Sequence, residues 1–434
     1  MPEDLTKAAG AVRKWLAAVL RENSYARDTL TNTLGLLAAA ALPVLILPIL
    51  ARLYSPEDFG LLGVTAAATG LGTIASTGRY EAAILLPKRE TDAIAVAMVA
   101  ACFVLATTAL LGGAVCVAWL MNVSLIRQHA ELAILVVVST SFAGSAQILI
   151  NWAIRGRRFA LSSMARIASA TTTALASVVF GLLGAGAAGL AAAAAAGYLA
   201  SCLALGVSLY LRRNATAIPT GADIVAQARK YRDFPLFSLP SDLANTLATN
   251  LPVLFFSTFF GAAAAGYLTM FQRIWAGTAV LVQGLGETFR QRAASERHDT
   301  GSFVNTMNMT FRALAALAVV LFATLLALGP LLFELFMGPQ WREAGVYGQI
   351  LAPLVCLQFI ASPLSWSFYL AERLRLLMAW QWLLLATFLA TLSIGGYLFD
   401  AKNTLLGLSL VGSVLYAAYT FLSLQMAATN ATDR

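Results

Sequence analysis

The sequence predicts an all-α integral membrane protein, and three observations lead to that fold class. Apolar residues make up 59% of the 434 residues and charged residues only 12%, which is about half the charged share of an average soluble domain. The apolar residues form long continuous blocks, most of them reaching the roughly 20 residues that a helix needs to cross a bilayer. The blocks lack the alternation of barrel strands. Because lipid cannot hydrogen-bond to the backbone, these blocks are predicted to be transmembrane helices.

Twelve such blocks are separated by short polar joints, and an amphipathic segment precedes them. The segment places Val12, Trp15 and Leu16 at helical spacing beside Arg13 and Lys14, a pattern typical of a helix that lies on a membrane surface. It has no signal-peptide pattern. The predicted spans are residues 30–51, 59–78, 92–120, 131–154, 160–183, 187–211, 236–259, 264–287, 303–329, 346–371, 376–398 and 404–427.

The positive charges predict the orientation of these spans. Of the 29 Lys and Arg residues, 22 fall in the alternate joints that share a side with the N-terminus, 4 fall in the other joints and 3 lie inside spans. Basic residues stay on the cytoplasmic side of such proteins, so both termini are predicted to be cytoplasmic in a bacterial inner membrane. The net charge of +8 is explained by this topology, and no nucleic-acid partner is expected.

The two halves of the chain resemble each other. A Leu-Pro-Val-Leu segment occurs at 42–45 and again at 251–254, and the segment that contains Gly60 resembles the one that contains Gly266. The offset between the copies falls from 209 to 206 residues. The joint between the two segments is therefore three residues shorter in the second copy, which is about one helical turn. This repeat predicts two lobes of six helices related by a pseudo-two-fold axis along the membrane normal. The predicted divisions are a cytoplasmic amphipathic segment at 1–29, an N-lobe at 30–211, a cytoplasmic linker at 212–235 and a C-lobe at 236–434.

Polar side chains fall on single helix faces in the cytoplasmic halves of several spans. Placing a polar side chain inside a membrane costs free energy, so a charged residue within a span indicates a transport pathway unless another role is found for it. An arginine-lined vestibule open to the cytoplasm is the predicted arrangement, and it suits diphosphate, which guanidinium groups bind in bidentate fashion. Snorkelling of arginine to the interface is the alternative. The candidate substrate-binding residues are Arg79, Glu81, Asn151, Arg155, Arg166, Asp242, Asn245, Arg273, Asn308 and Arg312.

The sequence offers little for catalysis. Both histidines, His129 and His298, fall in predicted joints, and no zinc, Walker or nucleophile-elbow motif is recognisable. We expect no cofactor, no metal and no enzyme activity, with transport driven by a partner, an ion gradient or the membrane potential. The four cysteines lie inside apolar blocks, and we interpret them as small core residues rather than disulfide partners. They are Cys102, Cys116, Cys202 and Cys356.

Two segments near the start of the chain resemble a known family. The segments from Arg52 to Gly60 and from Thr77 to Pro87 resemble the opening of Wzx-type flippases, the polysaccharide-biosynthesis branch of the MOP superfamily that also holds MurJ and the MATE exporters. Later segments at 231–240, 341–345 and 358–363 are similar to that family too. The resemblance implies two six-helix lobes around a central cavity, alternating access, and an undecaprenyl-diphosphate-linked oligosaccharide as the substrate.

The resemblance also implies site residues and partners. Cationic cavity residues of that family are thought to engage the diphosphate, and Arg79 and Glu81 match its motif by position. Arg79 is equally well explained as a positive-inside anchor paired with Glu81. A polysaccharide polymerase and glycosyltransferases are the possible partners.

Four classes of function remain open at this point. A lipid-linked oligosaccharide flippase is the first. A MATE-like ion-coupled exporter is the second, and it would require an acidic residue deep in an early span, whereas Asp28 and Asp58 are peripheral. A flippase for the peptidoglycan precursor lipid II is a related possibility. A membrane-bound polymerase or ligase would want a long outer loop. A non-catalytic scaffold would differ from a flippase in that its deletion would only slow export.

Overall fold

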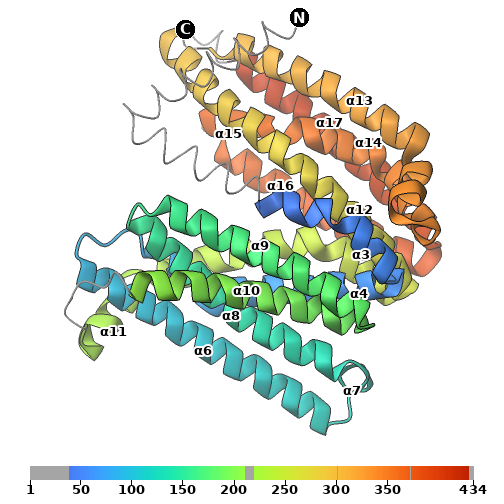
Figure 1. The fold of residues 1–434 in the computed structure, drawn as a ribbon. Coiled ribbons are helices and arrows are strands. Elements are labelled where there is room, and N and C mark those ends of the chain that lie inside the picture. Colours follow the sequence, from blue (N-terminus) through green and yellow to red (C-terminus); the bar gives the residue numbers. More distant parts are fainter. Residues whose placement is uncertain (1–38, 211–218, 301, 372, 430–434) are drawn as a thin grey trace, which may run out of the picture. The chain divides into compact units, whose positions relative to one another are not determined.

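The computed structural model describes residues 39–210, 219–300, 302–371 and 373–429, so the predicted amphipathic segment lies outside the described residues. The described part is helical and contains no strand (Figure 1). Its helices are α3 Leu47–Leu53, α4 Pro56–Thr77, α5 Tyr80–Ala83, α6 Glu90–Leu120, α7 Ser124–Gln128, α8 Ala130–Arg155, α9 Phe159–Leu182, α10 Gly186–Tyr210, α11 Gly221–Lys230, the π-helix η1 Phe234–Ser238, α12 Leu239–Thr300, α13 Val304–Met337, the 3-10 helix η2 Pro339–Trp341, α14 Arg342–Leu364, α15 Trp366–Leu370, α16 Leu374–Leu398 and α17 Ala401–Thr429.

The predicted twelve spans agree with these helices. Within the described residues, 10 helical stretches are long and apolar enough to cross a membrane. One of them continues from η1 through α12 and holds two predicted spans, which are separated at Gly261 by a non-helical φ of 87° and ψ of 172°. The first predicted span begins before residue 39 and ends in α3. The chain is therefore a multi-pass α-helical membrane protein, and its described helices are consistent with the twelve-helix arrangement.

Two helices continue beyond the ends of the predicted spans. The ninth span was predicted to stop at residue 329, but α13 continues through Pro330 to Met337. A membrane helix tolerates a proline when neighbouring groups satisfy the backbone that the proline leaves unpaired. Here α14 packs directly against the proline, because a Cβ on Gly345 would lie 2.5 Å from Pro330 Cα. The eighth span was predicted to end at residue 287, and α12 continues to Thr300.

Many large apolar side chains of the spans are exposed, as a lipid-facing surface requires. Leu105 and Leu110 of α6 are 70% and 73% exposed, and Val320 of α13 is 62% exposed. A soluble protein rarely leaves so much apolar area uncovered. The same surface corrects the interpretation of two cysteines: all four are free, but Cys102 and Cys116 are exposed on α6 rather than packed in the core.

The described helices pack into two compact units, and the first contains Ala68–Phe180 and Ala188–Ala244. In this unit α6 packs against α8 and α11, and α6, α8, α9 and α10 run alongside one another (Figure 1). Small residues allow the close packing. A Cβ on Gly144 would lie 2.4 Å from the Ser76 hydroxyl, so α8 can approach α4 only without a side chain there.

The second unit contains Val44–Ala67, Gly181–Ala187 and the described chain from Asn245 onward. Here α14 packs against both α13 and α17. Its core includes Phe289, Phe303 and Met307, each at most 1% exposed. Both α4 and α12 contribute residues to both units, so the contacts do not follow chain order.

Candidate functional site

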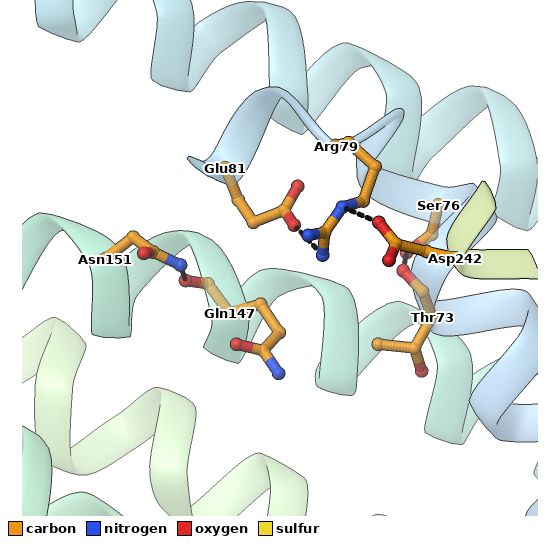
Figure 2. Close-up of polar contacts among 7 residues, drawn as sticks. All are labelled: Thr73, Ser76, Arg79, Glu81, Gln147, Asn151 and Asp242. Carbon is orange, nitrogen blue, oxygen red and sulfur yellow. Dashed lines mark hydrogen bonds and ion pairs between the residues drawn. The ribbon is translucent and has the colours of Figure 1, made fainter. Parts of the chain in front are cut away.

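The most distinctive polar group of the first unit lies at the turn between α4 and α5. Gly78 and Arg79 both adopt left-handed backbone conformations, with φ of 55° and 62°. Glycine does this freely, but arginine does so at a cost, and such strain is often retained at functional positions. The turn reverses the chain so that the side chains of Arg79 and Glu81 face each other (Figure 2).

Arg79 lies between two carboxylates, and we call Arg79, Glu81 and Asp242 the polar junction. Its Nη1 donates to Glu81 Oε1 at 3.0 Å, and its Nε lies 2.8 Å from Asp242 Oδ2 on α12 (Figure 2). Glu81 is only 5% exposed, and its Oε2 has no hydrogen-bond partner among the described residues. One guanidinium faces two carboxylates, so the junction carries a formal charge of −1. An anion gains little from Arg79 while both carboxylates hold it.

Packing around Tyr80 holds the polar junction in place. The Tyr80 hydroxyl donates to the Ala228 carbonyl of α11 at 2.8 Å, and its ring lies 5.4 Å from that of Phe103 on α6. Tyr80 is 3% exposed in a cluster with Ile84, Val96 and the η1 residue Phe234. The turn is thereby fixed to α6 and α11. The π-helix η1, which follows α11 in the chain, leads into α12 and Asp242, and π-helices are frequent at functional sites.

Two further predicted residues lie near the turn, and their side chains are already bonded. Arg155, at the end of α8, donates from Nη1 to the Ile84 carbonyl at 2.8 Å and from Nη2 to the Pro87 carbonyl at 2.6 Å. These bonds give Arg155 a structural role, because they hold the segment between α5 and α6. Asn151 donates from Nδ2 to the Gln147 carbonyl one turn earlier in its own helix (Figure 2).

Arg166 differs from the other candidate cations of the first unit. It lies half-buried on α9, and its Nε is buried without a hydrogen-bond partner in the described part of the chain. Leaving a buried donor unpaired is costly, since the group has lost its water. Arg79 Nε, in contrast, lies 2.8 Å from the Asp242 carboxylate, so Arg166 is the one of the two whose Nε has no acidic partner among the described residues.

The remaining candidates lie on α12 and α13. The guanidinium carbon of Arg273 is 5.9 Å from the centroid of the Phe59 ring, a cation–π contact. Asn245, Asn308 and Arg312 are exposed. The structure therefore brings together Arg79, Glu81 and Asp242.

Sequence reasoning did not identify which residues would pair across the chain. Periodicity placed Asp242 on a helix face with Asn245 but could not relate it to Arg79, which is 163 positions away. Nor did it predict that Arg155 would bond to carbonyl groups. The available signal was the Gly78–Arg79 pair between α4 and α5, since a glycine directly after an apolar block marks a sharp turn.

A family profile matches most of the chain. The profile described as "Polysaccharide biosynthesis protein" matches residues 49–346. No curated protein sequence matches the chain significantly.

Solved transporters of the MOP superfamily share the fold. A multidrug resistance MATE family transporter in an inward-facing conformation matches with a TM-score of 0.60 at 15% identity, over 93% of this chain and 96% of that one. A MOP superfamily transporter from Pyrococcus furiosus, described as having a binding pocket of reverse polarity, matches with 0.55 at 14% identity over 93% and 96%. An outward-facing MATE transporter matches with 0.53 at 13% over the same shares. At these identities the likeness establishes the fold.

Proposed function

Because the chain belongs to the polysaccharide biosynthesis protein family, we propose that it moves a lipid-linked oligosaccharide, carried on undecaprenyl diphosphate, from the cytoplasmic to the periplasmic leaflet. One observation carries the proposal: a polysaccharide-biosynthesis profile matches a chain whose fold is that of MOP superfamily transporters. The fold has the spans to form a path for a sugar headgroup, and membership of a polysaccharide biosynthesis family supports a sugar as the cargo. Both termini are cytoplasmic in this proposal, and a polymerase takes up the product.

The described residues suggest separate roles for phosphate and sugar. The polar junction has one cation and two carboxylates, so it suits neutral hydroxyl groups, which can donate to carboxylates and accept from guanidinium. Arg166 has a buried, unpaired Nε and suits the diphosphate. We therefore assign the phosphate contact to Arg166 rather than to Arg79. Arg273 and Arg312 remain candidates on the other unit.

Deletion followed by complementation tests the proposed function. Without the protein, lipid-linked oligosaccharide is expected to accumulate on the inner leaflet while the surface polysaccharide disappears. Restoring the wild-type chain reverses both. If the lipid-linked units still reach the periplasmic leaflet at a reduced rate, the protein is a scaffold and the proposal fails.

Arg166→Gln tests the assignment of the phosphate contact. It removes the charge and the outer part of the guanidinium but keeps an N–H donor close to the position of Nε. We expect at least a tenfold loss of export at unchanged membrane levels, since charge-assisted bonds to phosphate are the stronger ones. Arg229→Gln, on an exposed position of α11, is the matched control. Wild-type export by Arg166→Gln would remove Arg166 from the path.

A further inference from the structure

Two connecting segments of the first unit carry basic side chains that the polar junction does not use. One segment joins α5 to α6, and the other is the turn between α8 and α9. We call their four cations the basic rim, and they are Lys88, Arg89, Arg157 and Arg158. Arg158 is partly exposed and the other three are exposed. None of the four forms an ion pair with another residue that the structure describes.

Arg155 holds these two segments together. Its guanidinium donates to the Ile84 carbonyl at 2.8 Å and to the Pro87 carbonyl at 2.6 Å. A longer bond of 3.5 Å reaches the carbonyl of Arg89, which belongs to the rim itself. Arg155 is the last residue of α8 and lies two positions before Arg157. The backbones that carry the four rim cations are therefore brought to one place by a fifth cation, whose own charge is directed at carbonyl groups.

The turn between α8 and α9 carries its arginines at a conformational cost. The Arg157 amide donates to the Ile154 carbonyl at 2.9 Å. The Arg158 amide donates to the Ala153 carbonyl at 2.8 Å, and these two bonds form the Schellman motif that ends many helices. Glycine is usual at the position of Arg157, because φ is positive there, yet arginine adopts a φ of 54°. The positive-inside rule favours a cation near this end of α8 but does not require one in this conformation.

Apolar side chains lie beside the basic rim. Leu85 and Leu86 precede Lys88 in the segment between α5 and α6, and they are 44% and 56% exposed. Exposed apolar residues next to basic ones at the end of a span are typical of the boundary between acyl chains and headgroups. Glu90 and Asp92 follow in the first turn of α6. Four cations against two carboxylates leave this surface with an excess of positive charge.

From this arrangement we propose that the basic rim binds the phosphate of an anionic phospholipid headgroup, with Leu85 and Leu86 against the acyl chains. Clusters of about four or more Lys and Arg residues beside a span attract anionic lipids, and guanidinium groups bind phosphate oxygens in bidentate fashion. The inference takes only the orientation from the proposed function, in which this end of the first unit is cytoplasmic. A bound lipid would tie the segment after α5 to the end of α8, beside the polar junction.

Protection from trypsin tests where the lipid binds. The purified full-length protein is digested in a nonionic detergent with added dioleoylphosphatidylglycerol, and cleavage after Lys88 and Arg89 is followed by mass spectrometry. We expect this lipid to slow the cleavage at least about fivefold, because a bound ligand suppresses the local opening that cleavage needs. Cleavage after Lys230, an exposed residue of α11, is the reference within the same chain and should change little.

Two further additives separate the contribution of the charge from that of the chains. Dioleoylphosphatidylcholine has the same chains without a net charge, and glycerol 3-phosphate has the phosphate without the chains, so neither should protect. Raising the salt concentration from about 0.1 M to about 1 M shortens the screening length from about 10 Å to about 3 Å and should remove most of the protection by phosphatidylglycerol. Equal protection by both lipids, or protection by glycerol 3-phosphate alone, overturns the inference.

A double variant tests whether the two segments act together. Arg157→Gln with Arg158→Gln leaves the reporter cleavage sites intact and should lower the protection from fivefold to less than about twofold. Arg229→Gln with Arg232→Gln removes the same charge from exposed positions in and after α11, keeps the reference site, and should retain the protection. Full protection in the first variant, or an equal loss in both, overturns the basic rim as the binding site.

The outcome can be distinguished from that of the proposed function, because the digestion contains no lipid-linked oligosaccharide. A chain that phosphatidylglycerol protects but that exports nothing retains the lipid site and loses the proposed function. A chain that exports the oligosaccharide without this protection retains the function and loses the lipid site. If undecaprenyl phosphate protects and phosphatidylglycerol does not, the rim contacts the carrier of the substrate, and the inference is overturned.

Discussion

The polar junction in the first unit and a contact between α4 and α12 in the second unit hold their helices by opposite means. In this contact, which we call the glycine crossing, Gly60 faces the Ala262 carbonyl and Gly266 faces the Pro56 carbonyl, each too closely to admit a Cβ. The junction joins the α4–α5 turn to α12 with charges, one guanidinium between two carboxylates. The crossing joins α4 to α12 with bare backbone and excludes side chains. A charged contact tolerates small movements but is costly to break, whereas a backbone contact tolerates no added volume but separates without leaving charges behind. The chemistry of each contact therefore indicates which changes it will resist.

The largest effect is expected at the edge of the crossing. Trp341→Ala removes a fully buried indole, its bond to the Ala51 carbonyl and its contacts with Phe59 and Tyr267. Truncation of a buried aromatic costs about 3–5 kcal/mol. The purified protein should unfold at a clearly lower temperature in detergent. Trp382→Ala, at a position that is 60% exposed, is the control and should change the midpoint little; equal midpoints for both variants would contradict the buried role of Trp341.

A smaller effect is expected at the polar junction. Arg79→Ala leaves the buried Glu81 carboxylate without its partner, and we expect a loss of about 2–3 kcal/mol because Arg79 is itself partly exposed. Combining it with Glu81→Ala removes the unpaired charge and should restore part of the loss. Thermal unfolding of the two single variants and the double variant measures the coupling. Strictly additive losses would show that the two side chains do not interact.

Arg155 tests whether the neighbourhood of the junction depends on carbonyl bonding. Arg155→Ala leaves the Ile84 and Pro87 carbonyls without their charged donor, a loss of about 2 kcal/mol. The segment between α5 and α6 contains exposed Lys88 and Arg89, so trypsin should cut it faster in the variant. Arg157→Ala, outside this network and exposed, is the comparison. Identical digestion patterns would remove the structural role of Arg155.

The smallest effect is expected at α11, which packs against α6 beside the junction. Thr220 and Asp223 form a reciprocal cap, and the hydrogen bonds from the Thr220 side chain and backbone lower the pKa of Asp223. Because this pKa is lower when folded, the cap is complete above the ordinary aspartate pKa and is lost as pH falls through the lowered value. Thr220→Ala should speed amide exchange in 221–230 about fivefold at neutral pH. Unaltered exchange would mean that the cap does not hold the helix.

Much of the fold could be predicted from the sequence, because span length, apolar continuity and basic joints are local signals. They placed helix ends such as Leu120 and Leu398 correctly. They failed at Pro330, where α13 continues to Met337 and packs closely against Gly345 of a helix that follows it in the chain. The site was harder, because pairing is not local. Helix faces identified Arg79 and Asp242 as polar positions but not as partners, and the repeat revealed Gly60 and Gly266 without showing that they meet.

Gly261 has a consequence for how the two halves of α12 are joined. The first copy of the repeat turns between α3 and α4 through two residues, Tyr54 and Ser55. The second copy turns at this single glycine, with φ of 87° and ψ of 172°. A swing of the later half of α12 against the earlier half is therefore concentrated in the torsions of one residue. Any L-amino acid there would adopt this conformation only at a cost, since the conformation is nearly exclusive to glycine. A substitution at Gly261 would therefore strain the junction between the two halves of α12.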